Sequence, residues 1–330
     1  MAEAISDETA KTMRRLWFDY LDTVEAVRPK LHAYCLRLTG SVFDAEDLVQ
    51  ETLLRAFAAV GRGDLGMGPS LIRNSRAYLS RVATNLWIDA QRRRGRDATD
   101  EDGVVSLEPP RESAMVTPAS AAALFERTAP QERAAVVLKD VFDFSLEEIA
   151  EILSTSVGAV KAALHRGRGK LADRRHAATP PRGTPASRDL INRFIAAFNA
   201  RDIRAVTALL SETVIYEASG VGGEMGHGAT WVAVNVERPP GVVSERHVFE
   251  GEEIVVGVIE GRGGKVLLGV SRLEQADGRV SRHVGYFFTP ETLVLVAEAL
   301  GMRAANHGYH QDPDTLERMI AGTRLPWRDV

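Results

Sequence analysis

The residues best suited to chemistry in this chain are positively charged side chains that gather in two places. Between residues 73 and 96 there are seven arginines and one acid, Asp89. Between residues 161 and 175 there are six lysines and arginines and one acid, Asp173. The formal net charge is −4, so these clusters are local features. Clustered guanidinium and ammonium groups bind the phosphates of a polyanion, and the sequence predicts two such surfaces.

The first cluster lies on a predicted helix, "RAYLSRVATNLWIDAQRRRGR", residues 76–96. At 100° per residue over residues 79–92, five apolar side chains fall within about 50° of one direction. They are Leu79, Val82, Ala83, Leu86 and Ala90. The opposite stripe consists of Arg81, Asn85, Ile88 and Arg92. Two arginines, an amide and an aliphatic side chain suit phosphates together with base edges or extruded bases. A solvated helix face with one stray isoleucine explains the same pattern.

The second cluster ends a predicted helix–turn–helix. "SLEEIAEIL" opens with a capping box formed by Ser145 and Glu148, "STS" supplies the turn, and "VGAVKAALHRGRGKL" is a basic second helix. The side predicted to face the core carries Val160, Leu164, Gly167 and Leu171. The side predicted to face away carries Ala162, His165, Arg166 and Gly169, flanked by Lys161 and Arg168. Small and basic side chains on one helix face suit docking in the major groove.

Length and composition narrow the class of protein. A chain of 330 residues with 45% apolar residues predicts two or three globular domains. We expect no membrane span, because no apolar run approaches the ~20 residues that one needs, and no signal peptide at the N-terminus. The single cysteine, Cys35, excludes an internal disulfide and a multi-thiolate metal site, and we interpret it as a small buried side chain. We therefore expect a cytoplasmic protein without a metal or other cofactor.

Composition also divides the chain into segments. Residues 19–95 predict three helices, the second with Asp44 as its N-cap. Residues 97–118 are acidic and aperiodic, and "ATPPRGTPAS" (178–187) contains three prolines, so both are linkers. After two helices, period-two apolar runs and the hairpin turn "ADGR" (276–279) predict an α+β domain with a curved antiparallel sheet. A helix capped by Thr289 closes it, and the last thirty residues read as a loosely attached helical tail.

Three of these stretches together carry a family resemblance. "DAEDLVQETLLRAF", "RAYLSRVATNLWIDAQRRRGR" and "LFERTAPQERAAVVLKDVFDFSLEEIAEILSTSVGAVKAALHRGRGKL" resemble a bacterial sigma-70-type factor of the extracytoplasmic-function group over residues 15–175. The resemblance implies an all-α region 2 in residues 1–97, a linker in 98–119, a helix–turn–helix region 4 in 120–178 and a linker in 179–186. It implies core RNA polymerase and promoter DNA as partners, with transcription initiation and promoter melting as the function.

The resemblance also implies roles for individual residues. The surface that docks on core RNA polymerase would consist of Asp44, Glu46, Asp47, Gln50 and Glu51. The −10 element would be melted and read by Arg81, Asn85, Ile88, Arg92, Arg93 and Arg94, with Asn85 beside a flipped base. The −35 element would be approached by Lys161, Ala162, His165, Arg166 and Arg168. Because extracting a base costs a few kcal/mol of stacking, polar and aliphatic groups beside a cationic rim suit that task.

Residues 187–302 resemble a SnoaL-like domain of the cone-shaped nuclear-transport-factor-like superfamily, and 303–330 would be a C-terminal tail. "SGVGGEMGHG", "RPPGVV" and "TPETL" partly match the motifs of sigma factors that carry such a domain. This implies regulation by a small-molecule ligand or by intramolecular contact with the sigma regions. The candidate pocket residues are Tyr216, His227, His283 and Tyr286. We interpret "GVGGEMGHG" as structural glycines rather than a phosphate-binding loop, because it lacks a Gly-Lys-Ser/Thr sequence.

Two other classes of function remain open from sequence. A helix–turn–helix regulator with a ligand-sensing domain fits the second basic cluster, although it leaves the acidic helix and "RVATN" unexplained. An enzymatic cone fold would use acid–base side chains in an apolar pocket, with Glu217 and His247 added to the candidates above. No pair of these candidates has a diagnostic spacing. We therefore predict no catalytic residues.

Overall fold

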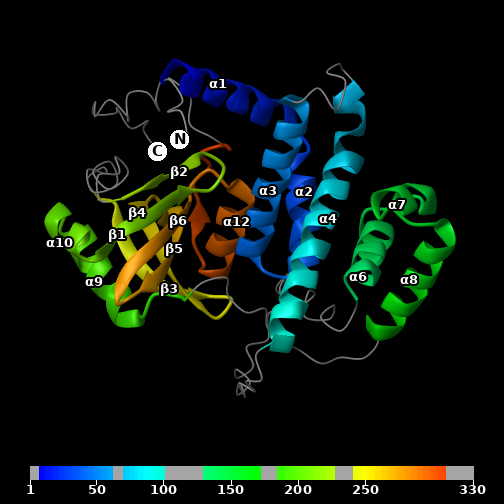
Figure 1. The fold of residues 1–330 in the computed structure, drawn as a ribbon. Helices are drawn as coiled ribbons and strands as arrows, with labels where there is room; N and C mark the ends of the chain where they lie inside the picture. Colours follow the sequence, from blue (N-terminus) through cyan, green and yellow to red (C-terminus); the bar gives the residue numbers. More distant parts are fainter. Residues whose placement is uncertain (1–6, 62–69, 101–128, 172–183, 227–240, 310–330) are drawn as a thin grey trace. The chain divides into compact units, whose positions relative to one another are not determined.

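The structure is a computed structural model that describes residues 7–61, 70–100, 129–171, 184–226 and 241–309 (Figure 1). The chain forms two compact units, one of residues 23–179 and one of residues 1–22 together with 180–330. Most of the first predicted linker and part of the second lie outside the described residues. The boundaries predicted for them stay predictions.

The first half of unit 23–179 is a bundle of helices α2 (Arg28–Thr39), α3 (Val42–Gly61) and α4 (Ser70–Asp100), each in contact with the other two (Figure 1). Three helices were predicted over residues 19–95, whereas the structure has a fourth, α1 (Asp7–Val24). Asp44 is not the N-cap of α3, because the helix already begins at Val42 and the Asp44 amide donates to Ser41 Oγ at 3.4 Å. Helix α4 continues three residues into the predicted linker.

The second half of this unit contains α6 (Pro130–Val136), the π-helical turn η1 (Val137–Val141), α7 (Leu146–Ile152) and α8 (Val157–Leu171). The predicted capping box is confirmed: Ser145 Oγ accepts the Glu148 amide at 3.1 Å, and Glu148 Oε2 accepts the Ser145 amide at 2.8 Å. Residues 153–156 separate α7 from α8, as the helix–turn–helix pattern predicted. Gly167 allows α8 to pack closely on α6, since a Cβ there would lie 2.7 Å from Val136 Cγ2.

The C-terminal unit is an α+β domain built on one curved sheet. Its helices are α9 (Arg188–Asn199), α10 (Ile203–Ala208) and α12 (Pro290–Ala299). Its strands are β1 (Leu210–Ala218), β2 (Gly222–Met225), β3 (Val243–Phe249), β4 (Glu252–Gly261), β5 (Gly264–Ala276), β6 (Arg279–Tyr286) and β7 (Arg303–Ala304). The sheet order is β2-β1-β6-β5-β4-β3, with β7 added beside β5. This is the cone-shaped α+β architecture that the sequence predicted, except that the β1–β6 and β5–β7 pairs are parallel and not antiparallel.

Local chemistry explains the turns of this sheet. Asp277 and Gly278 connect β5 to β6 with φ of 51° and 72°, which is the type I′ pattern of two-residue hairpins. The glycine-rich stretch after β1 forms a hairpin with β2, in which a Cβ at Gly223 would lie 2.8 Å from the Tyr216 carbonyl oxygen. Gly223 therefore has a structural role in this hairpin. Thr289 stands at the N-cap of α12, but its side chain makes no capping hydrogen bond there.

The predicted loose tail is wrong for its first residues. Arg303 and Ala304 pair with Val266 and Leu267 of β5, so the chain after α12 returns to the sheet. Tyr309 Oη then donates to Glu291 Oε1 at 2.7 Å. Residues 310–330 lie outside the described part of the chain. Among the helices that are described, none combines the length and apolar character needed to cross a bilayer.

Candidate nucleic-acid interface

The outward face of α8 is the better exposed of the two predicted DNA-binding surfaces. Val160 and Leu164 are buried against the rest of the helix–turn–helix, and Gly167 contacts α6. All five predicted residues are exposed: Lys161, Ala162, His165, Arg166 and Arg168. The wheel prediction for α8 is thus confirmed wherever the side chains are described; those of Gly169 and Leu171 are not.

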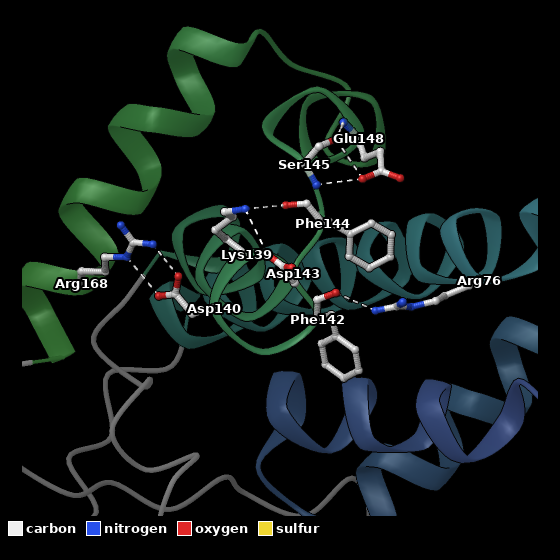
Figure 2. Close-up of polar contacts among 9 residues, drawn as sticks. All are labelled: Arg76, Lys139, Asp140, Phe142, Asp143, Phe144, Ser145, Glu148 and Arg168. Carbon is white, nitrogen blue, oxygen red and sulfur yellow. Dashed lines mark hydrogen bonds and ion pairs between the residues drawn. The ribbon is translucent and has the colours of Figure 1, made fainter.

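The basic residues of this face fall into two groups. Arg166 Nε donates to Glu132 Oε1 at 2.7 Å. Arg168 Nε donates to Asp140 Oδ2 at 3.0 Å (Figure 2). The second pair is bidentate, and its hydrogen bond raises the pKa of Arg168. Lys161 and His165 have no acidic partner among the described residues. Lys161 and His165 are therefore more available to bind DNA than Arg166 and Arg168, whose guanidinium groups are paired with carboxylates.

The structure adds a residue that the sequence analysis missed. An open hollow of about 680 Å³ is lined by Lys139 of η1, Leu146 of α7 and four residues of α8: Lys161, Leu164, His165 and Arg168. Lys139 Nζ donates to the Phe144 carbonyl oxygen at 3.2 Å and pairs with Asp143 at 3.3 Å. Three cationic side chains thus border one concavity beside the recognition helix. The sequence signal was weak, because no other lysine or arginine lies between Arg133 and Lys161.

The predicted −10 stripe on α4 is only partly exposed. Asn85, Arg92 and Arg93 face solvent and Arg81 is half-buried, which agrees with the wheel. Ile88 is not exposed as predicted, since only 6% of its surface is accessible. The side chain of Arg94 lies outside those described. Two of the arginines make local contacts: Arg92 pairs with Asp89 at 3.8 Å, and Arg93 Nε donates to the Asp89 carbonyl oxygen at 3.4 Å.

The cause of this difference is a second packing partner for α4. Besides α2 and α3, the helix contacts α6 and α7 of the helix–turn–helix. The Arg133 guanidinium of α6 lies over the Trp87 ring at 5.4 Å from its centroid, and Trp87 is buried. Arg76, which the sequence analysis counted only as part of a basic run, donates to the Phe142 carbonyl oxygen at 2.7 Å. A helix packed on two sides leaves only a narrow exposed stripe.

The predicted acidic docking surface on α3 loses one member. Glu46 is fully buried, forms an ion pair with buried Arg28, and accepts a hydrogen bond from Gln50 Nε2 at 2.6 Å. Its carboxylate therefore stabilises the region 2 core and is not available to a partner, contrary to the prediction. Glu51 is exposed, and Asp44, Asp47 and Gln50 are half-buried. Next to them, Leu54 is an exposed apolar side chain on the same helix.

The buried Cys35 agrees with its sequence interpretation. The thiol is fully buried in α2, and burial raises its pKa well above the ordinary range. Nearby, Tyr34 Oη and Thr84 Oγ1 share a hydrogen bond of 2.5 Å between α2 and α4. No cluster of three or more metal-ligating histidine, cysteine, aspartate or glutamate side chains occurs within the described residues.

Three of the four candidate pocket residues of the C-terminal domain are described, and they do not share one face of the sheet. Tyr216 and His283 are paired in the parallel β1–β6 ladder, with ring centroids 5.9 Å apart. Tyr286 follows His283 by three positions on β6, so it lies on the opposite face of the sheet. His227 lies outside the described residues.

The face that carries Tyr216 and His283 is packed. His283 is 2% exposed and its ring lies 6.1 Å from that of Phe194 on α9. Burial lowers its pKa to about 3, so its imidazole is neutral at pH 7, and burial raises the pKa of Tyr216. On the same face, the Phe287 ring packs directly against two glycines. A Cβ at Gly269 or at Gly285 would lie only 2.3 Å from an atom of that ring. Tyr216 and His283 are therefore buried core side chains of the domain.

Comparisons with known proteins match the two helical regions. Residues 23–97 match the family model Sigma-70 region 2, and residues 124–171 match Sigma-70, region 4. The ECF RNA polymerase sigma factor SigJ of Mycobacterium tuberculosis is 30% identical over 278 residues, covering 78% of this chain and 79% of SigJ. The chain belongs to the ECF sigma factors.

Other relatives in this family match smaller parts of the chain. The sigma factor SigG of Mycobacterium tuberculosis is 36% identical over 234 residues, covering 60% of this chain and 61% of SigG. The chain thus spans less than two thirds of the length of SigG. Among solved structures, the crystal structure of SigJ shares 23% identity, covers 82% of this chain and 97% of that one, and has a TM-score of 0.31.

The C-terminal domain has its own structural relatives. An NTF2-like protein of unknown function from Burkholderia xenovorans shares 21% identity, covers 30% of this chain and 80% of that one, and has a TM-score of 0.25. The described part of this domain is α+β, which is the fold class that the sequence predicted.

Proposed function

We propose that this chain acts as an alternative sigma factor: it binds core RNA polymerase, recognises −35 and −10 promoter elements and promotes promoter melting. The observation that carries the proposal is the exposed face of α8 in a matched region 4. Lys161, Ala162 and His165 are presented on one side of a helix whose other side is buried. Membership in the ECF sigma factors indicates core RNA polymerase as the partner. The exposed face of α8 offers side chains that can recognise promoter DNA.

We propose that Asn85 contacts the extruded −10 base and that Arg92 and Arg93 hold the adjacent phosphates. Their exposure on α4 supports these roles. Ile88 is buried in this arrangement, so it would reach DNA only after α4 separates from the helices that pack on it. On α8 we assign Lys161 and His165 to direct contacts, with Arg166 and Arg168 beside them.

We propose that core RNA polymerase docks on the exposed part of α3, with Asp44, Asp47, Gln50 and Glu51 as contacts and Glu46 excluded. Exposed carboxylates suit an electrostatically steered encounter with a basic surface. A pull-down with purified core polymerase tests this directly. The Asp47→Asn, Glu51→Gln double variant should bind more weakly at 0.15 M salt. Equal binding by the variant and the original chain would contradict this docking surface.

We infer that the C-terminal domain regulates initiation and does not catalyse a reaction. The packed surroundings of Tyr216 and His283 support this, because an acid–base pair needs access to a substrate. Incubation of the full chain with ketosteroid-like and polyketide-like molecules should give no turnover. Turnover that is lost in His283→Ala would contradict the inference and favour an enzyme.

We also propose that the chain acts in the cytoplasm, together with core RNA polymerase. Run-off transcription with purified core polymerase tests the proposed function as a whole. DNA fragments selected from a random pool by the chain–polymerase complex would serve as templates. Region 1–178 should direct initiation on them, and chains ending near residues 178, 302 and 330 should differ in activity. Equal activity of these three chains would refute the regulatory role of the C-terminal domain. If residues 1–178 do not bind core polymerase, the proposed sigma-factor function is refuted.

A further inference from the structure

The exposed side of α8 carries a row of small side chains. Ala159, Ala162 and His165 follow one another at intervals of three positions, so they form one ridge along the helix surface. All three are exposed, whereas Val160 on the opposite side is buried. Ser156 Oγ accepts the Ala159 amide at 3.2 Å, which fixes the start of the helix. The row of Ala159, Ala162 and His165 is called the reading ridge here.

The length of the reading ridge suits a few base pairs. Its two intervals of three residues span about 9 Å at a rise of 1.5 Å per residue. This is roughly three steps of 3.4 Å along duplex DNA. In a helix–turn–helix, the N-terminal residues of the second helix contact base edges in the major groove. The ridge begins in the first turn of α8, so it lies where such contacts form.

The chemistry of the reading ridge is mainly apolar. The methyl side chains of Ala159 and Ala162 have no hydrogen-bonding group, and the group that they fit in the major groove is the 5-methyl of thymine. His165 is the member of the ridge whose side chain can form hydrogen bonds. An imidazole N–H donates to a single acceptor, such as N7 of a purine. The ridge therefore offers two methyl contacts and one hydrogen bond.

The arginines beside the ridge are not free to read guanine. An arginine that donates to both O6 and N7 of guanine makes the commonest specific contact to a base. Both arginines of α8 are engaged with carboxylates instead, because Arg166 pairs with Glu132 and Arg168 pairs with Asp140. Figure 2 shows the guanidinium of Arg168 joined to Asp140. A base contact by either arginine would first break an ion pair.

The lysine beside the ridge belongs to a cationic hollow. Lys161, Arg168 and Lys139 line the same concavity of about 680 Å³. Three like charges around one hollow favour an anion there, and the anion that duplex DNA presents is phosphate. Phosphate contacts position a protein on the duplex but carry no sequence information. Base reading is therefore left to the ridge.

We propose that the reading ridge recognises a duplex through two thymine methyl groups, contacted by Ala159 and Ala162, and through one purine N7 atom, contacted by His165. This inference deepens the proposed recognition of the −35 element and rests on that function. The cations on either side of the ridge hold the phosphates. The element bound by α8 thus contains thymine at two neighbouring positions, and a purine follows within the next base pairs.

The test changes single atoms of the DNA. The probe is the labelled duplex that the complex of the full chain with core polymerase selects from a random pool, and competition binding to this complex is measured. Deoxyuridine, which lacks the 5-methyl group, replaces the thymines of the −35 element one at a time. At two neighbouring positions it should weaken binding about fourfold, as expected for losing one buried methyl group. A 7-deazapurine, which has carbon in place of N7, should weaken binding about fivefold at one position.

Substitutions in the chain then assign each DNA atom to a side chain. In Ala162→Gly, deoxyuridine at one of the two positions should no longer weaken binding, while the 7-deazapurine effect remains. Ala159→Gly should do the same for the other position. His165→Ala should lose the 7-deazapurine effect and keep both deoxyuridine effects. Each comparison is a ratio of affinities within one variant, so a general loss of helix stability cancels from it.

Lys161→Ala is the matched control on the same helix. It should weaken binding to all of these duplexes by the same factor, because a phosphate contact does not depend on the base. Both deoxyuridine effects and the 7-deazapurine effect should therefore persist in Lys161→Ala.

Three outcomes would overturn the proposal. The first is a selected −35 element without neighbouring thymines. The second is the absence of any deoxyuridine effect or of any 7-deazapurine effect. The third is a set of effects that the Ala159, Ala162 and His165 variants leave unchanged. In each case the complex still binds a duplex, so the failure is distinct from that of the proposed function, in which the complex selects no duplex and both proposals are refuted.

Discussion

The two basic helices α4 and α8 began as equivalent patterns and differ in the folded chain. Each has an apolar side and an opposite stripe with cationic residues. On α8 that stripe stays exposed, because described neighbours cover only one side of the helix. On α4 the stripe is partly covered, because helices α6 and α7 pack on a second side. A helical wheel therefore predicts one packed side of a helix, and it gives no information about a second packed side.

The largest expected effect concerns the covered stripe itself. Ile88→Ala should destabilise unit 23–179 by about 2–4 kcal/mol, because it empties a buried aliphatic site. Urea unfolding followed by circular dichroism measures this free energy. His165→Ala on the exposed stripe of α8 is the control and should stay within about 0.5 kcal/mol. If Ile88→Ala and His165→Ala lowered the free energy of unfolding equally little, the stripe of α4 would be as exposed in solution as that of α8.

The buried side of α8 gives the next effect. Gly167→Val should destabilise region 4 by about 1–3 kcal/mol, since the new side chain would collide with Val136 and the Glu132 backbone. Gly158 lies on the same helix, where a Cβ would meet only Ser156 Oγ at 3.9 Å. Gly158→Ala should therefore be neutral or stabilising by up to about 1 kcal/mol. Thermal unfolding of the two variants checks the pair, and equal losses would show that α8 does not pack closely on α6.

His283, a predicted pocket residue of the C-terminal domain, is also buried. The His283 pKa of about 3 lies below its unfolded value near 6.5, so the unfolded chain binds the extra proton first. Stability contributed by the neutral imidazole is complete above about pH 6.5 and is lost as the pH falls towards 3. At pH 5 the loss should be about 2 kcal/mol.

Thermal unfolding of the full chain between pH 8 and pH 5 measures this dependence. His283→Phe should flatten the part of it that belongs to the C-terminal transition. His247→Phe is the control, because His247 is half-buried beside Glu245 rather than enclosed. An unchanged slope in His283→Phe would show that this histidine titrates normally and lies in an accessible site.

The exposed part of the α4 stripe should act in strand opening. Asn85→Ala should reduce open-complex formation about tenfold, while duplex binding changes little, because the amide reads a base only after extrusion. Permanganate footprinting measures opening, and a gel-shift assay with closed duplex measures binding. Arg92→Ala should instead weaken both. Equal losses of opening and duplex binding in Asn85→Ala would refute the assignment.

The smallest effects should separate the two groups of basic residues on α8. Lys161→Ala should lower the slope of log K against log salt by about one for a duplex bound by region 4. Arg168→Ala should lower it by less, because Asp140 already compensates that guanidinium. Asp140→Asn should strengthen duplex binding at 0.15 M salt about two- to threefold. Fluorescence anisotropy across a salt series checks the three variants, and equal slopes for the Lys161 and Arg168 variants would contradict the grouping.

Much of the fold was predictable because it depends on local chemistry. The Ser145–Glu148 capping box set the start of α7, and the Asp277–Gly278 pair set the β5–β6 hairpin. The apolar spacing in residues 157–168 predicted which side of α8 is buried. Each of these features is fixed by residues at most four positions apart, so sequence spacing alone contains the information.

Features that depend on distant segments were predicted wrongly or missed. Glu46 looked like one more acid on an exposed face, and only its proximity to Arg28 of the preceding helix makes it a buried ion pair. Ile88 looked exposed, because the wheel contains no second packing partner. Arg76 was counted only as part of a basic run, because nothing local points to the Phe142 carbonyl oxygen 66 positions away.

By itself, then, the sequence determined the order of regions, the helix–turn–helix, the α+β class of the C-terminal domain and the exposed face of α8. Periodicity, capping and turn residues encode these features locally. Only the tertiary structure decided which charges are exposed and which are paired, that Tyr216 and His283 are core side chains, and that α4 has two packed sides. The physical reason is that burial and ion pairing depend on which distant surfaces meet, and a one-dimensional pattern does not contain that distance.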